Sequence, residues 1–201
     1  MALGVPGRDS TSLAAADYFF RNRYRRAYFK NFTNLVPMER AGSIRKSMDT
    51  AERVLRRGKS MVVFPEGTRS LTGDMADFLP SLGYLALRSG VGLLPAWLEG
   101  TYESMPKGAA LPRSRALGVA FGPFLPIESL RTLTEGLSQQ ESWRLIAALA
   151  QRIVENLRAR ITTRLDLESA RAGWDGHKLG AGAEQRSQKP RPLPRLLNAV
   201  P

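Results

Sequence analysis

The feature that most constrains the fold of this chain is a short apolar run that ends in a charged turn. The run is Met61–Phe64, and it continues directly into Pro-Glu-Gly-Thr-Arg-Ser at residues 65–70. Such a run predicts a buried strand whose carboxyl end opens onto a loop, with Pro65 ending the ladder of hydrogen bonds. Ligands of open parallel sheets bind beyond the carboxyl ends of strands, so this loop is where a binding site is expected.

The side chains of the loop suit an anionic ligand. The guanidinium of Arg69 offers a planar fork to two phosphate oxygens, and the hydroxyl of Thr68 is a further donor. The backbone amide of Gly67 can also donate, and a glycine lets the backbone come close to a ligand. Glu66 can accept a hydrogen bond from a substrate hydroxyl. The sequence therefore predicts a phosphate-binding site at Glu66–Arg69.

Residues 64–70, Phe-Pro-Glu-Gly-Thr-Arg-Ser, resemble the third signature block of the glycerol-phosphate and lysophosphatidic acid acyltransferase family. Six fixed positions in a row make this match far more specific than a loose glycine pattern. Arg40 resembles the arginine that closes the second block of the family, and Pro95 corresponds to the proline of the fourth. The resemblance extends over roughly Leu13–Leu130.

The resemblance implies an activity in phospholipid biosynthesis. An acyl group would move from acyl-CoA or acyl-carrier protein to a hydroxyl of a lysophospholipid or glycerol phosphate. The residues that would bind this acceptor are Arg40, Glu66, Gly67, Thr68 and Arg69. Apolar residues around Pro95 line the acyl-chain side in the family, although ordinary core packing accounts for them equally well.

Two features of the family pattern are missing. The lysine that commonly follows the aromatic at Phe78 is Leu79 here, which removes one expected phosphate contact. The family's catalytic His-x-x-x-x-Asp block is also absent: the single histidine, His177, has Gly182 five positions later, and we expect it to be a solvated tail residue. Family spacing would place the block upstream of Met1. Either the chain begins late, as a fragment of a longer polypeptide, or it is a degenerate relative that binds without reacting, so we assign no catalytic residue.

The predicted fold is α/β, with a mostly parallel sheet flanked by helices, and it lacks its first elements if the chain begins late. We expect one domain over residues 1–172 and a disordered, basic, Pro/Gly-rich tail over 173–201. At Leu13–Phe20 the local pattern fits a strand or a helix, and the family resemblance favours a strand. The other expected elements are a basic helix at Asn22–Phe32, a strand at 34–38, a helix from Ser43 to Gly58, a strand at 61–64, a helix ending at Gly90, strands at 91–98 and 117–121, and a long helix capped by Ser138 and reaching Leu165.

Composition excludes several classes of protein. With no cysteine and one histidine, the chain has no disulfide framework and no usual zinc site, so we expect no metal and no cofactor. No apolar run approaches the ~18 residues needed to cross a bilayer. We therefore expect a cytoplasmic protein that associates with the membrane peripherally.

The net charge of +12 points to an anionic partner. Residues 1–59 carry 13 basic and 5 acidic side chains. In Asn22–Phe32 aromatic and basic side chains alternate, which suits a helix at a membrane interface as well as one whose aromatic residues are core. The alternative function is a binding module for an anionic membrane or a phosphorylated lipid. Nucleic acid is disfavoured because no nucleic-acid-binding motif is present.

Overall fold

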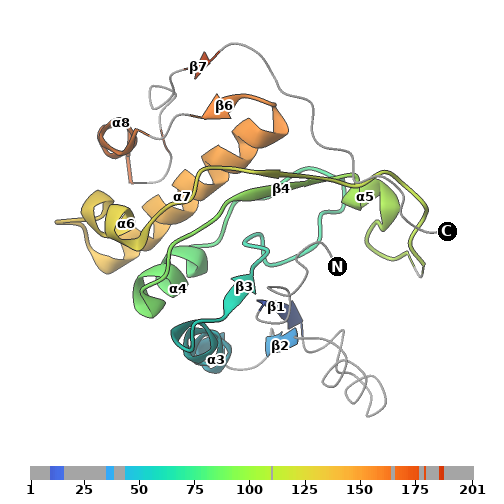
Figure 1. Cartoon of the computed structure of the whole chain (residues 1–201), viewed down its shortest axis with the longest axis horizontal. Coiled ribbons are helices and arrows are strands. Elements are labelled where there is room, and N and C mark those ends of the chain that lie inside the picture. The colour runs from blue at the N-terminus through green and yellow to red at the C-terminus, as the bar shows by residue number, and fades with distance from the viewer. Residues whose placement is uncertain are drawn as a thin grey trace. The chain divides into compact units, whose positions relative to one another are not determined.

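The computed structural model describes residues 10–15, 35–38, 44–109, 111–163, 166–176, 179 and 186–187 (Figure 1). They fall into two compact units. The first unit lies within residues 1–64 and 88–91, and the second within 65–87 and 92–201. The predicted helix at Asn22–Phe32 and the residues Arg40 and His177 lie outside the described part of the chain.

The first unit contains a parallel sheet in the order β2-β1-β3. Its strands are β1 (Ser10–Ala15), β2 (Leu35–Met38) and β3 (Ser60–Val62). β1 pairs in parallel with both neighbours, with Ser12 opposite Leu35 and Ser10 opposite Ser60. The chain therefore crosses from one side of β1 to the other through helix α3, and the predicted parallel α/β arrangement is confirmed.

Helix α3 (Ile44–Arg56) forms where the apolar pattern predicts it. Met48, Ala51 and Leu55 recur at helical spacing and are buried. Gly58, at a φ of 76°, follows the last turn as expected. Glu52 is only 9% exposed, and its carboxylate forms ion pairs with Arg56 at 2.9 Å and with Arg88 at 3.5 Å. Both charged partners compensate the burial of this carboxylate.

A strand forms near Met61–Phe64 as predicted, but it is not buried and it ends earlier than expected. β3 stops at Val62, and Val62 and Phe64 are 45% and 56% exposed. Among the described residues β3 pairs with β1 alone, so it is an edge strand with one unpaired side. An apolar run cannot distinguish a central strand from such an edge strand.

The second unit is built around helix α7 (Gln139–Arg158), which packs against strand β4 (Ala96–Glu99) (Figure 1). β4 pairs antiparallel with β5 (Gly118–Phe121). The core comes from α7, α4 (Ser81–Ser89), α6 (Ile127–Leu133) and the segments that join them. Its most deeply buried side chains include Ala86, Leu125, Leu130, Leu145, Ile146 and Ile153.

The start of α7 is as predicted and its end is not. Ser138 and Glu141 form a capping box: the Ser138 Oγ accepts from the Glu141 amide and the Glu141 carboxylate from the Ser138 amide. The helix was expected to reach Leu165, but it ends at Arg158. Arg160 takes a φ of 58°, and the amide of Ile161 donates back to the carbonyl of Asn156 at 2.8 Å. This left-handed residue turns the chain away before the apolar pattern ends.

The described part of the chain beyond α7 is short. β6 (Thr162–Thr163) pairs antiparallel with β7 (Arg186–Ser187), and α8 (Leu167–Ala172) lies between them in sequence. Leu179 is 5% exposed and belongs to the core cluster, and its carbonyl accepts a hydrogen bond from Arg152 at 2.7 Å. The boundary between domain and tail at residues 172 and 173 stays a prediction. Within the described residues no helix is long and apolar enough to cross a bilayer.

Candidate functional site

The loop predicted to bind phosphate lies between β3 and α4 and folds back on itself. The amide of Leu79 donates to the carbonyl of Pro65 at 2.9 Å, which closes the loop at its base. Gly67 has a φ of 70°, and a β-carbon there would lie 2.8 Å from Cδ1 of Leu79. Glycine is therefore favoured at this position by its backbone conformation, and a β-carbon there would make the end of the Leu79 side chain shift.

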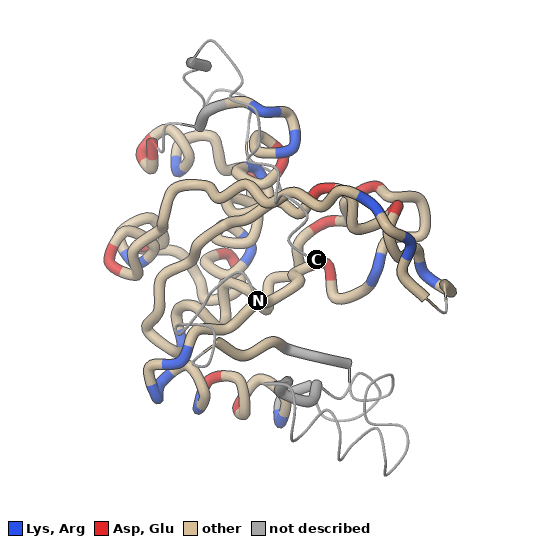
Figure 2. Tube along the Cα trace, turned by 45° about the vertical axis from the view of Figure 1, so that its right-hand side comes forward, with Lys and Arg blue, Asp and Glu red and all other residues tan. Residues whose placement is uncertain are grey.

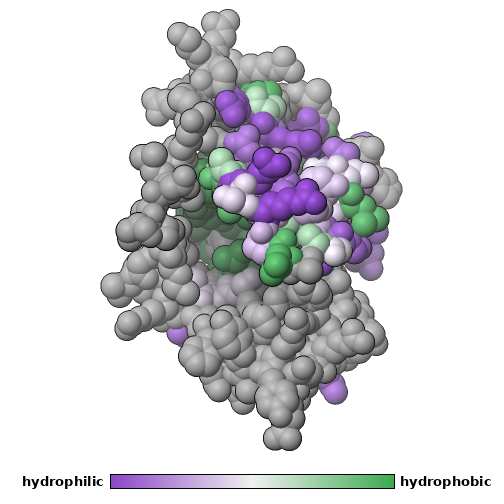
Figure 3. Space-filling model, turned by 90° about the vertical axis from the view of Figure 1, so that its right-hand side faces the viewer, coloured by the Kyte–Doolittle hydropathy of each residue, from purple (hydrophilic) through white to green (hydrophobic). Residues whose placement is uncertain are grey.

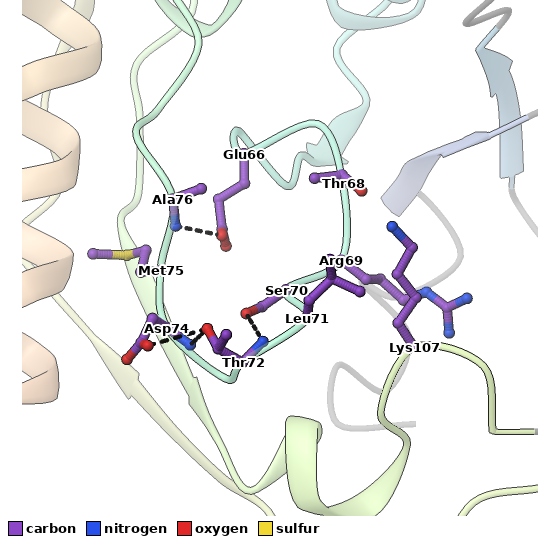
Figure 4. Close-up of a pocket in the computed structure, with 10 residues that line it drawn as sticks. All are labelled: Glu66, Thr68, Arg69, Ser70, Leu71, Thr72, Asp74, Met75, Ala76 and Lys107. Atoms are coloured by element: carbon purple, nitrogen blue, oxygen red, sulfur yellow. Dashed lines mark hydrogen bonds between the residues drawn. The ribbon is translucent and has the colours of Figure 1, made fainter.

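Polar side chains of the loop hold its backbone (Figure 4). The Oγ of Ser70 accepts from the amides of Thr72 at 3.3 Å and Gly73 at 2.8 Å. The hydroxyl of Thr72 donates to the carboxylate of Asp74 at 3.1 Å. One carboxylate oxygen of Glu66 accepts from the amide of Ala76 at 2.8 Å, across the loop. Glu66 thus has a structural role in addition to any contact with a ligand.

Helix α7 fixes the returning half of the loop. The side-chain oxygen of Gln151 accepts from the amide of Phe78 at 2.9 Å, and its nitrogen donates to Glu155 at 3.1 Å and Asp77 at 3.4 Å. Arg158 forms an ion pair with Asp74 at 3.6 Å. These contacts attach the loop to the longest helix of its unit, so its position does not depend on its own turns alone.

The loop encloses an open hollow of about 310 Å³. Figure 4 shows its lining, with Arg69 and Lys107 extending on the side opposite Ala76 and Met75. Both carboxylates in the lining already have partners. Glu66 accepts a hydrogen bond from the amide of Ala76, and Asp74 accepts one from the hydroxyl of Thr72 and forms an ion pair with Arg158. The hollow is lined by Glu66, Thr68, Arg69, Ser70, Leu71, Thr72, Asp74, Met75, Ala76 and Lys107. An anion would meet both cations on one side.

The structure brings three of the predicted site residues, Glu66, Thr68 and Arg69, to the same hollow. Gly67 supports the loop at Leu79 and does not line the hollow. Lys107 was not identified from the sequence as a site residue. It lies in a Gly/Pro loop with other cations, and nothing local separates it from Arg113 or Arg115. Within the described ranges no group of acidic or histidine side chains could hold a metal ion.

Known proteins similar to this chain are acyltransferases. A family model described as Acyltransferase matches residues 2–99. A chloroplastic 1-acyl-sn-glycerol-3-phosphate acyltransferase of Arabidopsis thaliana is 36% identical over 78 residues, which cover 37% of this chain and 22% of the relative. The 1-acyl-sn-glycerol-3-phosphate acyltransferase of Borreliella burgdorferi is 28% identical over 107 residues, covering 53% and 40%. The aligned segment thus spans less than half of each relative.

A solved structure shares the fold. The crystal structure of the 1-acyl-sn-glycerophosphate acyltransferase PlsC from Thermotoga maritima superposes with a TM-score of 0.56 at 24% identity, over 75% of this chain and 58% of that one. The fold is therefore that of an acyltransferase-like α/β protein. The signature loop, the family model and the matched relatives thus make this chain similar to the glycerol-phosphate and lysophosphatidic acid acyltransferase family.

Proposed function

We propose that this chain binds the acceptor substrate of an acyl transfer in phospholipid biosynthesis. The acceptor is a lysophospholipid or glycerol phosphate, and the donor is acyl-CoA or acyl-carrier protein. The observation that carries the proposal is that one loop presents Glu66, Thr68 and Arg69 to a single hollow. These side chains match the chemistry of such an acceptor, which carries a phosphate and at least one free hydroxyl.

The three side chains have distinct roles in this proposal. Arg69 binds two phosphate oxygens through its planar fork, and the hydroxyl of Thr68 donates a further hydrogen bond. Glu66 uses one carboxylate oxygen for the amide of Ala76, and its other oxygen accepts from an acceptor hydroxyl. Gly67 keeps the loop in this shape. Arg40 lies outside the described residues, and its phosphate-binding role stays a prediction from the sequence.

The transfer itself requires a base that removes the proton of the attacking hydroxyl. That oxygen then forms a bond to the thioester carbonyl, and the thiolate leaves as the ester is completed. None of the residues lining the hollow is a histidine. We therefore propose that this hollow binds and orients, and that the 201 residues alone show no thioester-dependent transfer, since losing a positioned base reduces the rate by ~10² to 10⁴.

Replacing Arg69 by Lys tests the binding role. Lysine keeps the charge but offers a single ammonium in place of the fork, so we expect sn-glycerol 3-phosphate to bind about tenfold more weakly. Titration calorimetry with the full chain measures this, and thioester turnover can be assayed on the same samples. Arg115→Lys is the matched control, because Arg115 is exposed and does not line the hollow. Unchanged affinity in Arg69→Lys would show that the loop does not hold the phosphate.

The proposal also includes a location and an alternative. We propose that the protein works on the cytoplasmic side of a membrane, bound peripherally through its excess of cations. The alternative is a catalytically inactive module that binds an anionic membrane or a phosphorylated lipid. The same hollow and the same net charge support it, and thioester-dependent transfer by the 201 residues would contradict both this alternative and the binding-only role proposed for the hollow.

A further inference from the structure

The two most exposed large apolar side chains of the described residues are leucines on loops that contact the same short helix. Leu111 is 78% exposed and Leu71 is 71% exposed. The hydroxyl of Tyr102, in α5 (Thr101–Ser104), donates to the carbonyl of Leu71 at 2.9 Å. Leu111 lies in the loop that follows α5. A single exposed leucine is ordinary on a protein surface, but two on adjacent loops call for an explanation.

The loop that follows α5 has a defined shape. Two hydrogen bonds close it at its base: the Oγ of Ser104 donates to the carbonyl of Arg113 at 3.0 Å, and the amide of Arg113 donates to the carbonyl of Ser104 at 2.7 Å. The carbonyl of Pro106 accepts from the amide of Ala109 at 3.1 Å, and Gly108 has a φ of 98°. A left-handed glycine as third residue is typical of a type II turn. The exposed leucine of this loop is therefore carried by a backbone that internal hydrogen bonds hold in place.

The same loop has an excess of positive charge. Residues 104–117 contain Lys107, Arg113 and Arg115 and no acidic residue, and the preceding Glu103 is the one acidic residue of α5. All three cations are exposed, and within the described part of the chain none of their side chains forms an ion pair. In Figure 2 basic residues lie along the outer part of this loop, at the right of the view. Exposed leucine and unpaired positive charge thus occur together.

This combination suits an anionic lipid surface. Leucine side chains enter the boundary between headgroups and acyl chains, while lysine and arginine contact the anionic headgroups. On the face of the molecule where α5 lies, hydrophobic residues are interspersed among hydrophilic ones (Figure 3). An acidic protein would also match the cations, but leucine is under-represented among the residues that dominate the binding energy of protein interfaces. The exposed leucines therefore favour lipid.

We propose that five residues form a surface that docks on anionic lipid, here called the α5 surface: Leu71, Lys107, Leu111, Arg113 and Arg115. The two leucines enter the lipid and the three cations bind headgroups. This inference rests on the peripheral membrane location proposed above and adds the surface that makes the contact. Leu71 and Lys107 also line the hollow, so an acceptor lipid reaches the hollow without leaving the membrane surface.

Sedimentation of the full chain with vesicles of phosphatidylglycerol and phosphatidylcholine tests the surface. Leu111→Gln should weaken binding about tenfold, and its loss should persist at raised salt because it is not electrostatic. Leu94→Gln is the matched control: Leu94 is 54% exposed and precedes β4, whereas α5 follows the other end of that strand. Arg115→Gln should weaken binding about fivefold at low salt. Arg131→Gln, at an exposed position on α6, removes the same charge and should have a smaller effect.

A second measurement reports insertion directly. Leu111→Trp should place an indole in the lipid, so its fluorescence should be quenched by lipids brominated in their acyl chains. Leu94→Trp should show no added quenching relative to the wild-type chain, which has three tryptophans of its own. Because Leu111 does not line the hollow, Leu111→Gln should bind sn-glycerol 3-phosphate in solution as the wild type does.

The possible outcomes separate the inference from the proposals on which it rests. If the wild type sediments with anionic vesicles and the variants of Leu111 and Arg115 behave like their controls, the inference is wrong and the peripheral location stands. A wild-type chain that does not sediment with these vesicles would refute the location and the inference together. Binding to polyglutamate that Arg115→Gln weakens, without quenching in Leu111→Trp, would assign the surface to an acidic protein and overturn the inference.

Discussion

Gly67 is the residue on which the shape of the phosphate loop depends most directly. Its φ of 70° disfavours any residue with a β-carbon, and Leu79 occupies the space where that atom would lie. We expect Gly67→Ala to reduce the free energy of unfolding by about 1 to 2 kcal/mol, mainly through the left-handed conformation, with a smaller addition because the end of the Leu79 side chain must shift. Urea unfolding measures the change.

Gly136→Ala separates the two causes. Gly136 has a φ of 75°, but no atom lies within 4 Å of its hypothetical β-carbon. This variant should therefore show the conformational effect alone and be the less destabilised of the two. Removing the Leu79 side chain in a Gly67→Ala background should recover part of the loss. Equal destabilisation of the two single variants would contradict the steric argument.

Site residues that are adjacent in the sequence could be predicted from it. Glu66, Thr68 and Arg69 are neighbours in sequence, so their shared hollow could be predicted from one loop. Lys107 could not, because it reaches the hollow only through the contact of Tyr102 with Leu71. No pattern of neighbouring residues in the sequence predicts a contact between residues so far apart. The roles of all these residues remain predictions.

Among the elements, α7 has the most clearly encoded beginning. The hydroxyl of Ser138 accepts from the amide of Glu141 and also donates to its carboxylate at 2.6 Å. We expect Ser138→Ala to destabilise the protein by about 1 kcal/mol, the usual effect of losing such a cap. Thermal unfolding at neutral pH measures this. Ser114→Ala, at an exposed position outside helices and strands, is the control and should have little effect.

The same cap predicts a dependence on pH. The hydrogen bond from the Ser138 hydroxyl, followed by that from the Ser138 amide, lowers the pKa of Glu141. Because this pKa is lower in the folded chain, the contribution to stability is complete above the unfolded value and is lost as the pH falls through the folded value. The difference between wild type and Ser138→Ala should therefore shrink in acid. A difference that stays constant down to strongly acidic pH would contradict the cap.

Other elements could not be fully predicted because their limits depend on neighbours. The apolar pattern after Ser138 continues to Leu165, but Arg160 turns the chain after Arg158. α6 follows Pro126 and buries Leu130 and Leu133, a stretch of seven residues too short for a clear helical period. The role of Gln151 could not be predicted either, because no sequence pattern marks it. It supports the site only because its side chain on α7 accepts a hydrogen bond from the amide of Phe78.

On the scale of the whole molecule, the net charge of +12 predicts binding to anionic membranes, which no single contact predicts. We expect the full chain to sediment with vesicles that contain phosphatidylglycerol and not with vesicles of pure phosphatidylcholine. Each surface cation should contribute up to about 1 kcal/mol to the free energy of binding. Raising the salt concentration should release it, since exposed charges are screened. Binding that ignores lipid charge and salt would indicate hydrophobic anchoring. Preference for DNA over these vesicles would favour a nucleic-acid partner.

The parallel sheet and the helix that crosses it were predictable at this scale, since strand, helix and strand follow one another along residues 35–62. The antiparallel pairing of β4 with β5 could not be predicted, because the segment between the two strands lacks the short turn of a standard hairpin. The prediction of one domain over residues 1–172 remains untested, and the described residues cluster into two units.

The first unit has an unusual dependence on the order of synthesis. The chain leaves it after Phe64 and returns only with residues 88–91, where Arg88 completes the ion pairs of the buried Glu52. A ribosome adding about 5 to 20 residues per second needs about 1 to 5 s to make residues 65–91. During that interval the unit has its strands and α3 but not its closing segment. The segment that completes the first unit is therefore made after the phosphate loop, although it belongs with residues that precede that loop.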